Sequence, residues 1–355
     1  MKTVYRTLIK RHQISSLFVS KRLITNTKQP TLYETLKVEE ISRDVFEQPT
    51  ATLHVLPGRH SVFGGQIIGS SMYAAQKTLT KNYPLHSLHS YFLMAADNSQ
   101  PIYYQVTRLR DGKSFETRSV TARQGDHTIF QCEMSFHRQE HSQMEHQPLM
   151  PEIDCKSPEQ LLSMYEVIQN LLVDKRLKPE LKLLIELALQ TPLPLDIRYC
   201  TQRDFLQPEP IYPARQLVWM KSLESLPDDP HLHRAAVAYA SDWVLLTTAY
   251  LPYGINNYHP RIKMQASLDH VMYFHDDFSF NGQLNQESTL SKPIRRSPLI
   301  PKMPPKVTVR ADDWLLYEII SPIAVNNRAL TFGRIWTRNG RLVVSCIQEG
   351  VIRFT

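Results

Sequence analysis

Cysteine is scarce in this chain. Its 355 residues include four cysteines, and no two of them form a CxxC pair. No secretory signal precedes them, so we expect reduced thiols rather than disulfides at Cys132, Cys155, Cys200 and Cys346. Without cysteines at the short spacings that zinc requires, a structural zinc site is not predicted.

Long hydrophobic runs are also lacking. The most apolar stretch extends from Ala235 to Leu251 and is interrupted by Ser241, Asp242, Thr247 and Thr248. A membrane-spanning helix needs about 20 consecutive apolar residues, which this stretch does not provide. We therefore expect a soluble protein without a membrane span.

Acidic residues are missing from positions 1–30, which carry seven of the 41 lysines and arginines. The formal net charge of +7 arises in this segment, because the rest of the chain has 34 basic and 34 acidic residues. A nucleic-acid-binding domain needs a basic face on its folded part, so nucleic acid is not an expected partner.

The same segment, residues 1–30, has the composition of a mitochondrial presequence. It is basic, contains several serines and threonines, and has apolar residues for one helical face. We expect it to direct the protein to the mitochondrial matrix; a disordered basic tail is the alternative. A C-terminal peroxisomal signal of the Ser-Lys-Leu type is not present, since the last residues are Arg353, Phe354 and Thr355.

Nucleotide-binding and metal-binding motifs are not recognisable. Phe63-Gly64-Gly65-Gln66 lacks the GxGxxG spacing and the Walker lysine, so its glycines serve either close packing or the exposure of helix N–H groups. His137, His141 and His146 lie in a polar segment with no apolar face to fix ligand geometry. We therefore predict neither a metal nor a cofactor.

One structural plan occurs in the first half of the chain, a helix followed by a strand meander. A nearly all-apolar helix is predicted over 66–79, and strands over 87–94, 102–109, 115–123 and 127–136. A helix without a polar face has to be buried, so we expect the strands to wrap around it.

The same plan returns in the second half. A helix is predicted over 233–248, and strands over 265–275, 314–320, 329–337 and 341–347. Two copies about 200 residues apart are too long for a solenoid repeat, so they indicate two fused halves packed about a local two-fold axis.

The predicted domain organisation follows from this duplication. We expect a presequence at 1–30, a first domain at 31–138, a helical linker at 139–194 and a second domain at 195–355. The linker has two helical patterns, the first opened by Ser157-Pro158-Glu159-Gln160, with proline at the first helical position and a capping-box glutamine. The irregular, proline-containing stretch 279–307 is predicted to be a long mobile loop inserted into the second domain.

Asp242 is the most unusual residue of the second half, because a carboxylate in an apolar helix must be hydrogen-bonded or neutralised. Two explanations are open: it caps the N–H groups of the following Trp-Val-Leu-Leu turn, or it is a general base in a cleft. Ser267 lies in a strand-like run and Gln348 follows another, where polar side chains could converge on a helix end. Taken singly, each of these residues is ordinary.

Six ordered motifs cover roughly residues 34–138 and 195–353. The first half has Phe63-Gly64-Gly65-Gln66 with Tyr73-Ala74-Ala75, then His89-Ser90-Tyr91-Phe92-Leu93, then Leu109-Arg110-Asp111-Gly112-Lys113-Ser114-Phe115. The second has Tyr239-Ala240-Ser241-Asp242, then Ser267-Leu268-Asp269-His270 with Tyr273-Phe274-His275, then Gln348-Glu349-Gly350-Val351. In these motifs the chain resembles the type II acyl-coenzyme A thioesterases, which have a double hot-dog fold.

The resemblance implies an α+β protein with two antiparallel sheets, each wrapping a central helix, fused as a pseudo-dimer. It implies hydrolysis of acyl-coenzyme A, the expected partner, to a free carboxylic (fatty) acid and coenzyme A, without a metal or redox cofactor. By motif, the family's catalytic Asp, Ser or Thr, and Gln fall on Asp242, Ser267 and Gln348 of the second domain. A homo-oligomer, either a dimer or a tetramer, is also expected by resemblance.

Departures from the family pattern leave alternatives. Met94-Ala95-Ala96-Asp97 stands where the family commonly has Arg-Pro-Gly-Asp, and 279–307 separates Ser267 from Gln348. Eukaryotic members are often peroxisomal, so the peroxisome is the alternative location. The alternative functions are a catalytically silent acyl-CoA-binding protein and an enoyl-thioester hydratase. The hydratase uses an Asp and His pair on a helix, and His233 lies too far along the helix from Asp242 to form that pair with it.

Overall fold

The computed structural model describes residues 30–56, 59–140, 142–152, 157–191, 193–201, 206, 211–255, 261–276, 278, 301 and 303–355. The predicted presequence up to residue 29, His141, Cys155 and positions 279–300 and 302 of the predicted loop lie outside these residues.

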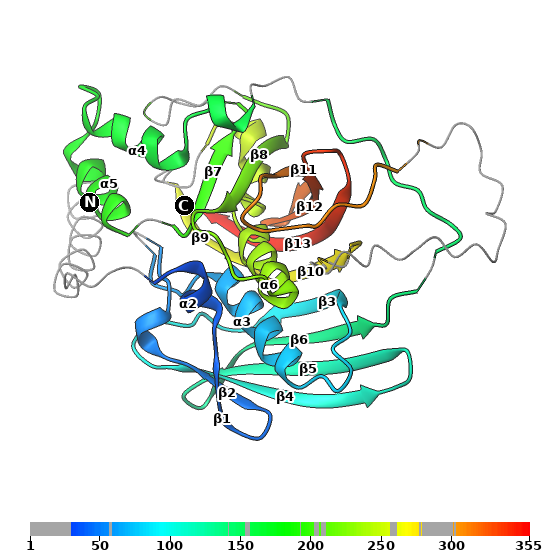
Figure 1. Ribbon diagram of the computed structural model, residues 1–355. Helices are drawn as coiled ribbons and strands as arrows, with labels where there is room; N and C mark the ends of the chain where they lie inside the picture. The colour runs from blue at the N-terminus through cyan, green and yellow to red at the C-terminus, as the bar shows by residue number, and fades with distance from the viewer. Residues whose placement is uncertain are drawn as a thin grey trace.

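The first half consists of a central helix, α3 (Gly64–Lys77), against an antiparallel set of strands (Figure 1). The strands are β1 (Glu39–Ser42), β2 (Val45–Gln48), β3 (Leu85–Phe92), β4 (Ile102–Asp111), β5 (Phe115–Gln124) and β6 (His127–His137). A short helix α2 (Leu32–Leu36) and the 3-10 turn η1 (Thr50–Thr52) precede α3. Every residue from Gly65 to Gln76 is buried, which confirms the helix predicted to lack a polar face.

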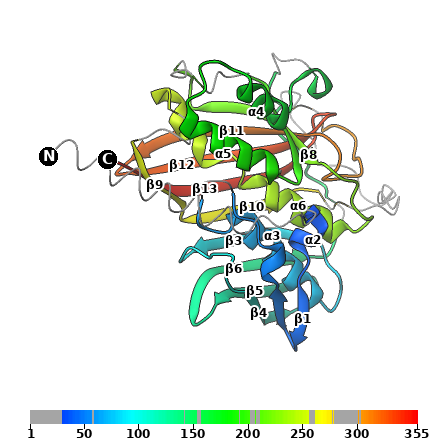
Figure 2. The same ribbon diagram turned by 90° about the vertical axis from the view of Figure 1, so that its left-hand side faces the viewer.

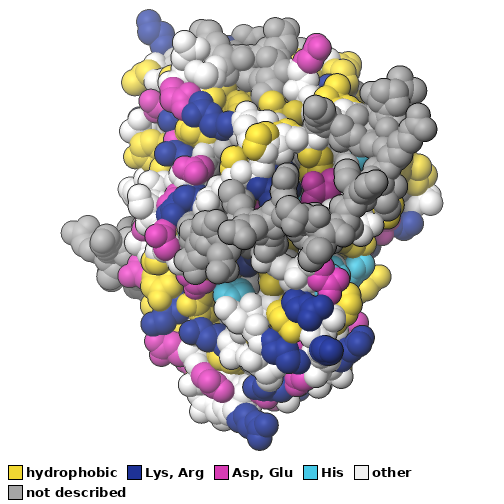
Figure 3. Space-filling view, turned by 45° about the vertical axis from the view of Figure 1, so that its right-hand side comes forward, with side chains coloured by type: hydrophobic (Ala, Val, Ile, Leu, Met, Phe, Trp, Pro, Cys, Tyr) yellow, Lys and Arg dark blue, Asp and Glu magenta, His cyan; other side chains and the backbone are white. Residues whose placement is uncertain are grey.

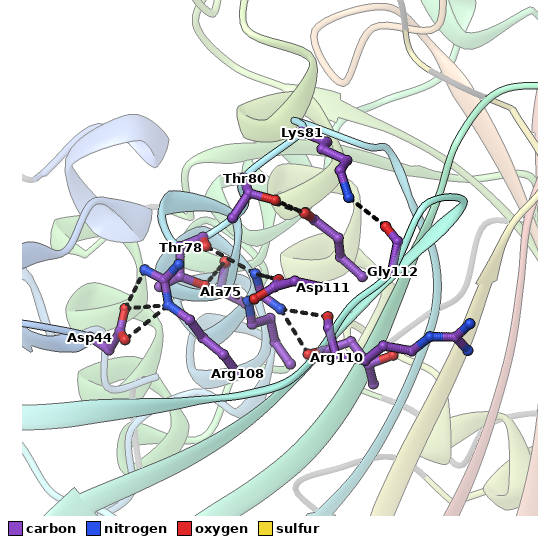
Figure 4. Close-up of polar contacts among 12 residues, drawn as sticks. Asp44, Ala75, Thr78, Thr80, Lys81, Arg108, Arg110, Asp111 and Gly112 are labelled. Atoms are coloured by element: carbon purple, nitrogen blue, oxygen red, sulfur yellow. Dashed lines mark hydrogen bonds and ion pairs between the residues drawn. The ribbon is translucent and has the colours of Figure 1, made fainter.

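A buried polar cluster ties the strands of this half to the C-terminal end of α3 (Figure 4). The fully buried Arg118 guanidinium donates to Asp111 Oδ1 at 2.6 Å, to Thr78 Oγ1 at 2.8 Å and to the Thr78 carbonyl at 3.0 Å. The Glu116 carboxylate accepts hydrogen bonds from the backbone N–H and the hydroxyl of Thr80. The buried Arg118 charge is paired with Asp111, and its N–H groups are hydrogen-bonded. The cluster therefore holds β4 and β5 against the end of the helix.

The second half repeats this arrangement around α6 (Pro230–Ser241), which the 3-10 segment η3 (Leu246–Tyr253) follows. Its strands are β7 (Leu195–Tyr199), β8 (Arg215–Ser222), β9 (Ile262–Ser267), β10 (Asp269–Phe274), β11 (Leu315–Val325), β12 (Arg328–Thr337) and β13 (Leu342–Phe354). The predicted strands are present in both halves; β1, β2, β7 and β8, which lie at the outer ends of the sheet, were not among them.

The two halves are joined through their sheets. The strand order β1-β2-β4-β5-β6-β3-β10-β13-β12-β11-β8-β7 is antiparallel throughout, and β9 pairs with β13. β3 pairs with β10, with His89 opposite Val271, so the predicted two sheets meet edge to edge and form one. α3 packs against α6 on one face of this sheet, which is the predicted fused pair (Figure 2).

The predicted helix over 233–248 is wrong in its extent. α6 begins at Pro230 and ends at Ser241, so Asp242 is its C-cap. Val244 has a φ of 57°, a left-handed conformation that is unusual for a β-branched residue, and a right-handed helix cannot pass through it. Asp242 therefore lies directly after the helix, at a place where its carboxylate can reach outside the α6 backbone.

The predicted strand over 265–275 is two strands. Both β9 and β10 pair with β13, but four positions separate Ser267 from Val271, whereas three separate their partners Gly350 and Ile347. The extra residue on the β9–β10 side is a bulge, which locally bends a strand and redirects its side chains. Ser267 lies at this bulge.

The linker between the halves contains η2 (Pro158–Gln160), α4 (Met164–Leu172) and α5 (Pro179–Gln190). Both predicted helical patterns are present, but the prediction that the first helix opens at Ser157 is wrong, because only one 3-10 turn follows that residue. α4 begins after Ser163, whose hydroxyl accepts from the Glu166 N–H while the Glu166 carboxylate accepts from the Ser163 N–H. This capping box supplies the start that sequence reasoning placed six residues earlier.

Candidate active site

The carboxylate of Asp242 lies where the two central helices meet. It accepts a hydrogen bond from the backbone N–H of Gly65, in the first turn of α3. A Cβ atom at Gly64 would lie 2.7 Å from Asp242 Oδ2, so the absence of a side chain permits this approach. The two glycines therefore serve both purposes considered from the sequence, close packing and the presentation of a helix N–H.

The contact also resolves the capping hypothesis for Asp242. The N-cap residue of α3, Phe63, makes no side-chain capping hydrogen bond, so Asp242 of the other half provides an acceptor at this helix end. A negative charge is stabilised at a helix N-terminus by the unpaired N–H groups and the helix dipole. The carboxylate thus caps α3 rather than the turn that follows Asp242 in sequence.

Gln348 on β13 and Ser267 at the end of β9 bring two further polar groups to this carboxylate. Gln348 Nε2 donates to Asp242 Oδ1 at 2.6 Å and to Ser267 Oγ at 3.0 Å. Ser267 Oγ lies 3.5 Å from the same Oδ1. The three residues singled out in the sequence therefore meet, although up to 106 positions separate them along the chain.

Burial determines the charge state of Asp242. Desolvation raises its pKa to about 6, and the hydrogen bonds from Gln348, Gly65 and Ser267 act in the opposite direction by stabilising the ionised form. The carboxylate is therefore largely ionised at neutral pH and can accept a proton there. A pKa near neutrality suits a carboxylate to general-base chemistry.

His270 on β10 completes the hydrogen-bonded group. The Ser241 hydroxyl donates to the Ala238 carbonyl at 2.8 Å, so it accepts from His270 Nε2 at 2.9 Å. Nε2 then carries the imidazole proton, and Nδ1 is an acceptor 3.3 Å from Gln348 Nε2, whose two N–H protons are shared among Nδ1, Asp242 Oδ1 and Ser267 Oγ. Complete burial lowers the pKa of His270 to about 3, which keeps the ring neutral.

The role of His270 was missed from the sequence, although the residue belongs to one of the quoted motifs. Its neutral imidazole accepts from the Gln348 amide and so favours the orientation in which Nε2, not Oε1, points at Asp242. In the flipped amide, Oε1 would face two other acceptors, His270 Nδ1 and Asp242 Oδ1, and this unfavourable contact gives the present orientation its preference. The only available signal was a histidine three residues after Ser267, within the same predicted strand.

Asp242, Ser267 and Gln348 line a cavity of about 1130 Å³. Its other walls come from both halves and from the linker, including Phe63 and Phe92 of the first half. Small-molecule sites usually have volumes of about 300–1,000 Å³, so this cavity can hold a large ligand. The Asp242 carboxylate and its partners lie on a wall that is otherwise largely apolar.

Other features noted in the sequence lie away from this cavity. The His137 ring stacks on Phe115, with centroids 4.2 Å apart, and within the described ranges no three His, Cys, Asp or Glu side chains are grouped to hold a metal. None of the described helices is long and apolar enough to cross a membrane. Basic and acidic side chains are interspersed over the face shown in Figure 3.

The fold places the chain among the double hot-dog proteins, and the cavity at the helix junction is a candidate hydrolase site. A crystal structure of the acyl-CoA thioesterase II TesB2 from Mycobacterium marinum is similar, with a TM-score of 0.62 and 31% sequence identity. The alignment covers 91% of this chain and 97% of that one.

Sequence comparisons define the family more closely. Family models match residues 55–137 (acyl-CoA thioesterase N-terminal domain), 211–292 (acyl-CoA thioesterase) and 302–352 (acyl-CoA thioesterase C-terminal domain). The human acyl-coenzyme A thioesterase 8 is 33% identical over 325 residues, which cover 90% of this chain and 87% of that protein. The chain belongs to the acyl-CoA thioesterase family, and the predicted family and fold are confirmed.

A yeast relative is more distant. The peroxisomal acyl-coenzyme A thioester hydrolase 1 of Saccharomyces cerevisiae is 24% identical over 338 residues, covering 83% of this chain and 86% of that protein.

Proposed function

We propose that the protein hydrolyses acyl-coenzyme A thioesters to a carboxylic acid and coenzyme A, with Asp242, Ser267 and Gln348 as catalytic residues. One observation carries the assignment: side chains from the end of α6, from β9 and from β13 converge within hydrogen-bonding distance on one cavity wall. Membership of the acyl-CoA thioesterase family supports the reaction, and this geometry supports the choice of residues.

Asp242 is the general base in this mechanism. Its ionised carboxylate takes a proton from water, and the water oxygen forms a bond to the thioester carbonyl carbon. The tetrahedral intermediate collapses with cleavage of the C–S bond, and protonated Asp242 returns its proton to the leaving thiolate of coenzyme A. The reaction is redox-neutral and needs no cofactor to balance it.

Gln348 and Ser267 position the attacking water. The buried Oε1 of Gln348 has no hydrogen-bond partner among the described residues, so it can accept from a water molecule while Nε2 holds Asp242. The Ser267 hydroxyl can provide a second contact beside the same carboxylate. A fixed water converts a bimolecular step into an oriented one, which is a major source of rate enhancement.

The N-terminus of α3 is suited to the developing oxyanion. The first N–H groups of a helix have no partner within the helix, and Gly64 lines the cavity beside Asp242. Preorganised donors of this kind are typically worth about 10²–10³-fold in rate.

His233, the histidine considered for the enoyl-thioester hydratase alternative, lies away from Asp242. His233 Nδ1 accepts from the Ala311 N–H at 2.9 Å, and Nε2 lies 3.1 Å from the Pro227 carbonyl oxygen. Both ring nitrogens are thus engaged with backbone groups near the start of α6, at the opposite end from Asp242.

A thiol-release assay tests the proposal, because free coenzyme A appears only if the thioester is cleaved. We expect Asp242→Asn to lower kcat by about 10²–10⁴-fold with little change in the thermal unfolding midpoint, since the side chains are nearly isosteric. Ser267→Ala and Gln348→Ala should each lose less, and their losses should not add, because the two residues hold one water. Wild-type turnover in Asp242→Asn would exclude this residue as the base.

Location, assembly and domain limits are further parts of the proposal. The basic, acid-free segment 1–30 supports the mitochondrial matrix, whereas the name of the yeast relative supports the peroxisomal alternative. A homo-oligomer is supported by Tyr91 and Tyr273, which are 63% and 38% exposed on the adjacent strands β3 and β10. The limits 31–138, 139–194 and 195–355 are proposed for the two domains and the linker.

A further inference from the structure

The linker helices form part of the wall of the catalytic cavity. Four residues of α4 (Met164, Tyr165, Ile168 and Leu171) and four of α5 (Leu181, Leu184, Ile185 and Ala188) line the same cavity as Asp242. The spacing of four and three positions within each helix puts the aliphatic members on one face. Figure 2 shows α4 and α5 in front of the strands of the second half.

Packing within the protein buries this apolar face only in part. None of the nine residues of α4 is buried, and the lining side chains Leu184 and Ile185 of α5 are only half-buried. The helices nevertheless have strong local starts, with a capping box at Ser163 and proline at the first position of α5. A well-formed apolar wall facing a cavity is suited to an apolar ligand.

The charge distribution indicates which part of an acyl-coenzyme A would lie against this wall. Phosphate groups need cationic or N–H donors, and α4 and α5 contribute no basic side chain to the cavity. Among the described lining residues, the lysines and arginines are Arg59, on a first-half loop, and Lys178, at the N-cap of α5. The helix wall therefore fits the acyl chain rather than the nucleotide.

We propose that the α4–α5 face is the acyl-binding wall and that Leu184 and Ile185 determine chain-length specificity in favour of long chains. From Leu181 to Ala188 the wall extends about 10 Å along α5, so an acyl group of a few carbons leaves most of it uncovered. The proposal rests on acyl-CoA hydrolysis at Asp242, because the thioester position sets the direction in which the chain extends.

The test compares Leu184→Trp with wild type on butyryl-, octanoyl- and palmitoyl-coenzyme A in the thiol-release assay. The larger side chain takes space from the acyl chain, so kcat/KM for palmitoyl-coenzyme A should fall by about tenfold or more. Hydrolysis of butyryl-coenzyme A should stay within about twofold of wild type, and this also reports that the variant is folded. Ile185→Gln should raise KM for the long substrate with little change in kcat, because it weakens binding uniformly.

Lys182→Trp is the matched control, since Lys182 is exposed on the same helix and does not line the cavity. It should leave the chain-length profile unchanged. Equal losses for all three substrates in Leu184→Trp, an unchanged profile in that variant, or the same change in Lys182→Trp would each overturn the acyl-wall proposal. Failure of the catalytic proposal looks different, because Asp242→Asn would then retain turnover on every substrate.

Discussion

At the residue scale, Asp242 combines two tasks that depend on its position after α6. It accepts the Gly65 N–H and so completes the first turn of α3, and it is the proposed base for the attacking water. Burial raises its pKa towards neutrality, while three hydrogen bonds keep it from rising further. Gln348 has the largest of these opposing effects, so the base strength of Asp242 depends on an amide that His270 orients.

The pH dependence of hydrolysis should follow this pKa. Because Asp242 must be ionised to accept a proton, kcat/KM should fall about tenfold per pH unit below about 6 and level off above it. Gln348→Ala should move the inflection to higher pH, because the variant lacks the hydrogen bond that lowers this pKa most. Steady-state rates between pH 4.5 and 8 measure both effects. An inflection unmoved by Gln348→Ala would contradict the assignment of the titration to Asp242.

At the element scale, the close approach of α3 and α6 creates the site. A Cβ atom at Gly65 would collide with the Tyr239 carbonyl oxygen and lie 2.6 Å from the Phe63 ring. Tyr239 is in α6, so a side chain at this position would push the two helices apart. The bulge at Ser267 also shapes the site. It separates β9 from β10, which both pair with β13, and it redirects the side chains of the bulged strand.

Gly65→Ala should therefore reduce both stability and activity. Overpacking of this kind typically costs about 1–3 kcal/mol, and moving α3 would also withdraw the N–H that Asp242 accepts. Urea unfolding and the thiol-release assay measure the two losses. Lys77→Ala, at the exposed end of the same helix, is the control and should change neither quantity appreciably. Full activity in Gly65→Ala would show that the contact is dispensable.

At the scale of the whole molecule, buried histidines link stability to pH. Burial lowers the pKa of His54 and His231 to about 4 and that of His270 to about 3, from 6.5 in the unfolded chain. Between the folded and unfolded pKa values the unfolded state binds more protons. The contribution of these neutral imidazoles to the free energy of unfolding is therefore fully present above pH 6.5 and decreases as the pH falls below it. Each imidazole contributes about 1.4 kcal/mol per pH unit in this window.

Asp242 has the opposite sign, because its folded pKa of about 6 lies above the usual 3.8. The native state then binds the extra proton between these values, which offsets one of the three histidines below pH 6. We expect the free energy of unfolding to decrease by about 4 kcal/mol between pH 7 and pH 5. Asp242→Asn should show a steeper decrease below pH 6, since the offset is removed. Urea titrations of both proteins, followed by tryptophan fluorescence, distinguish this from a flat profile.

The sequence by itself determined the central helices and the inner strands, because their signals are local; the outer strands β1, β2, β7 and β8 were not predicted. The apolar period of α3, the alternation and turn residues of the strands, and the repetition of this order predicted two similar halves. Boundaries were less accurate where tertiary contacts decide them. α6 ends at Ser241 because the chain turns at Val244, and β9 separates from β10 because both pair with one long strand. Neither feature has a local signature as strong as hydrophobic periodicity.

The site, too, was predicted in part from the sequence and decided in part by tertiary structure. Residue types and motif resemblance pointed to Asp242, Ser267 and Gln348, but their convergence was decided only by tertiary structure. Side chains far apart in the chain are brought together by sheet register and helix packing, which no short window of sequence contains. Three features depend on contacts with other elements of the fold. They are the glycines of α3, the orientation of the Gln348 amide by His270, and the apolar wall of α4 and α5.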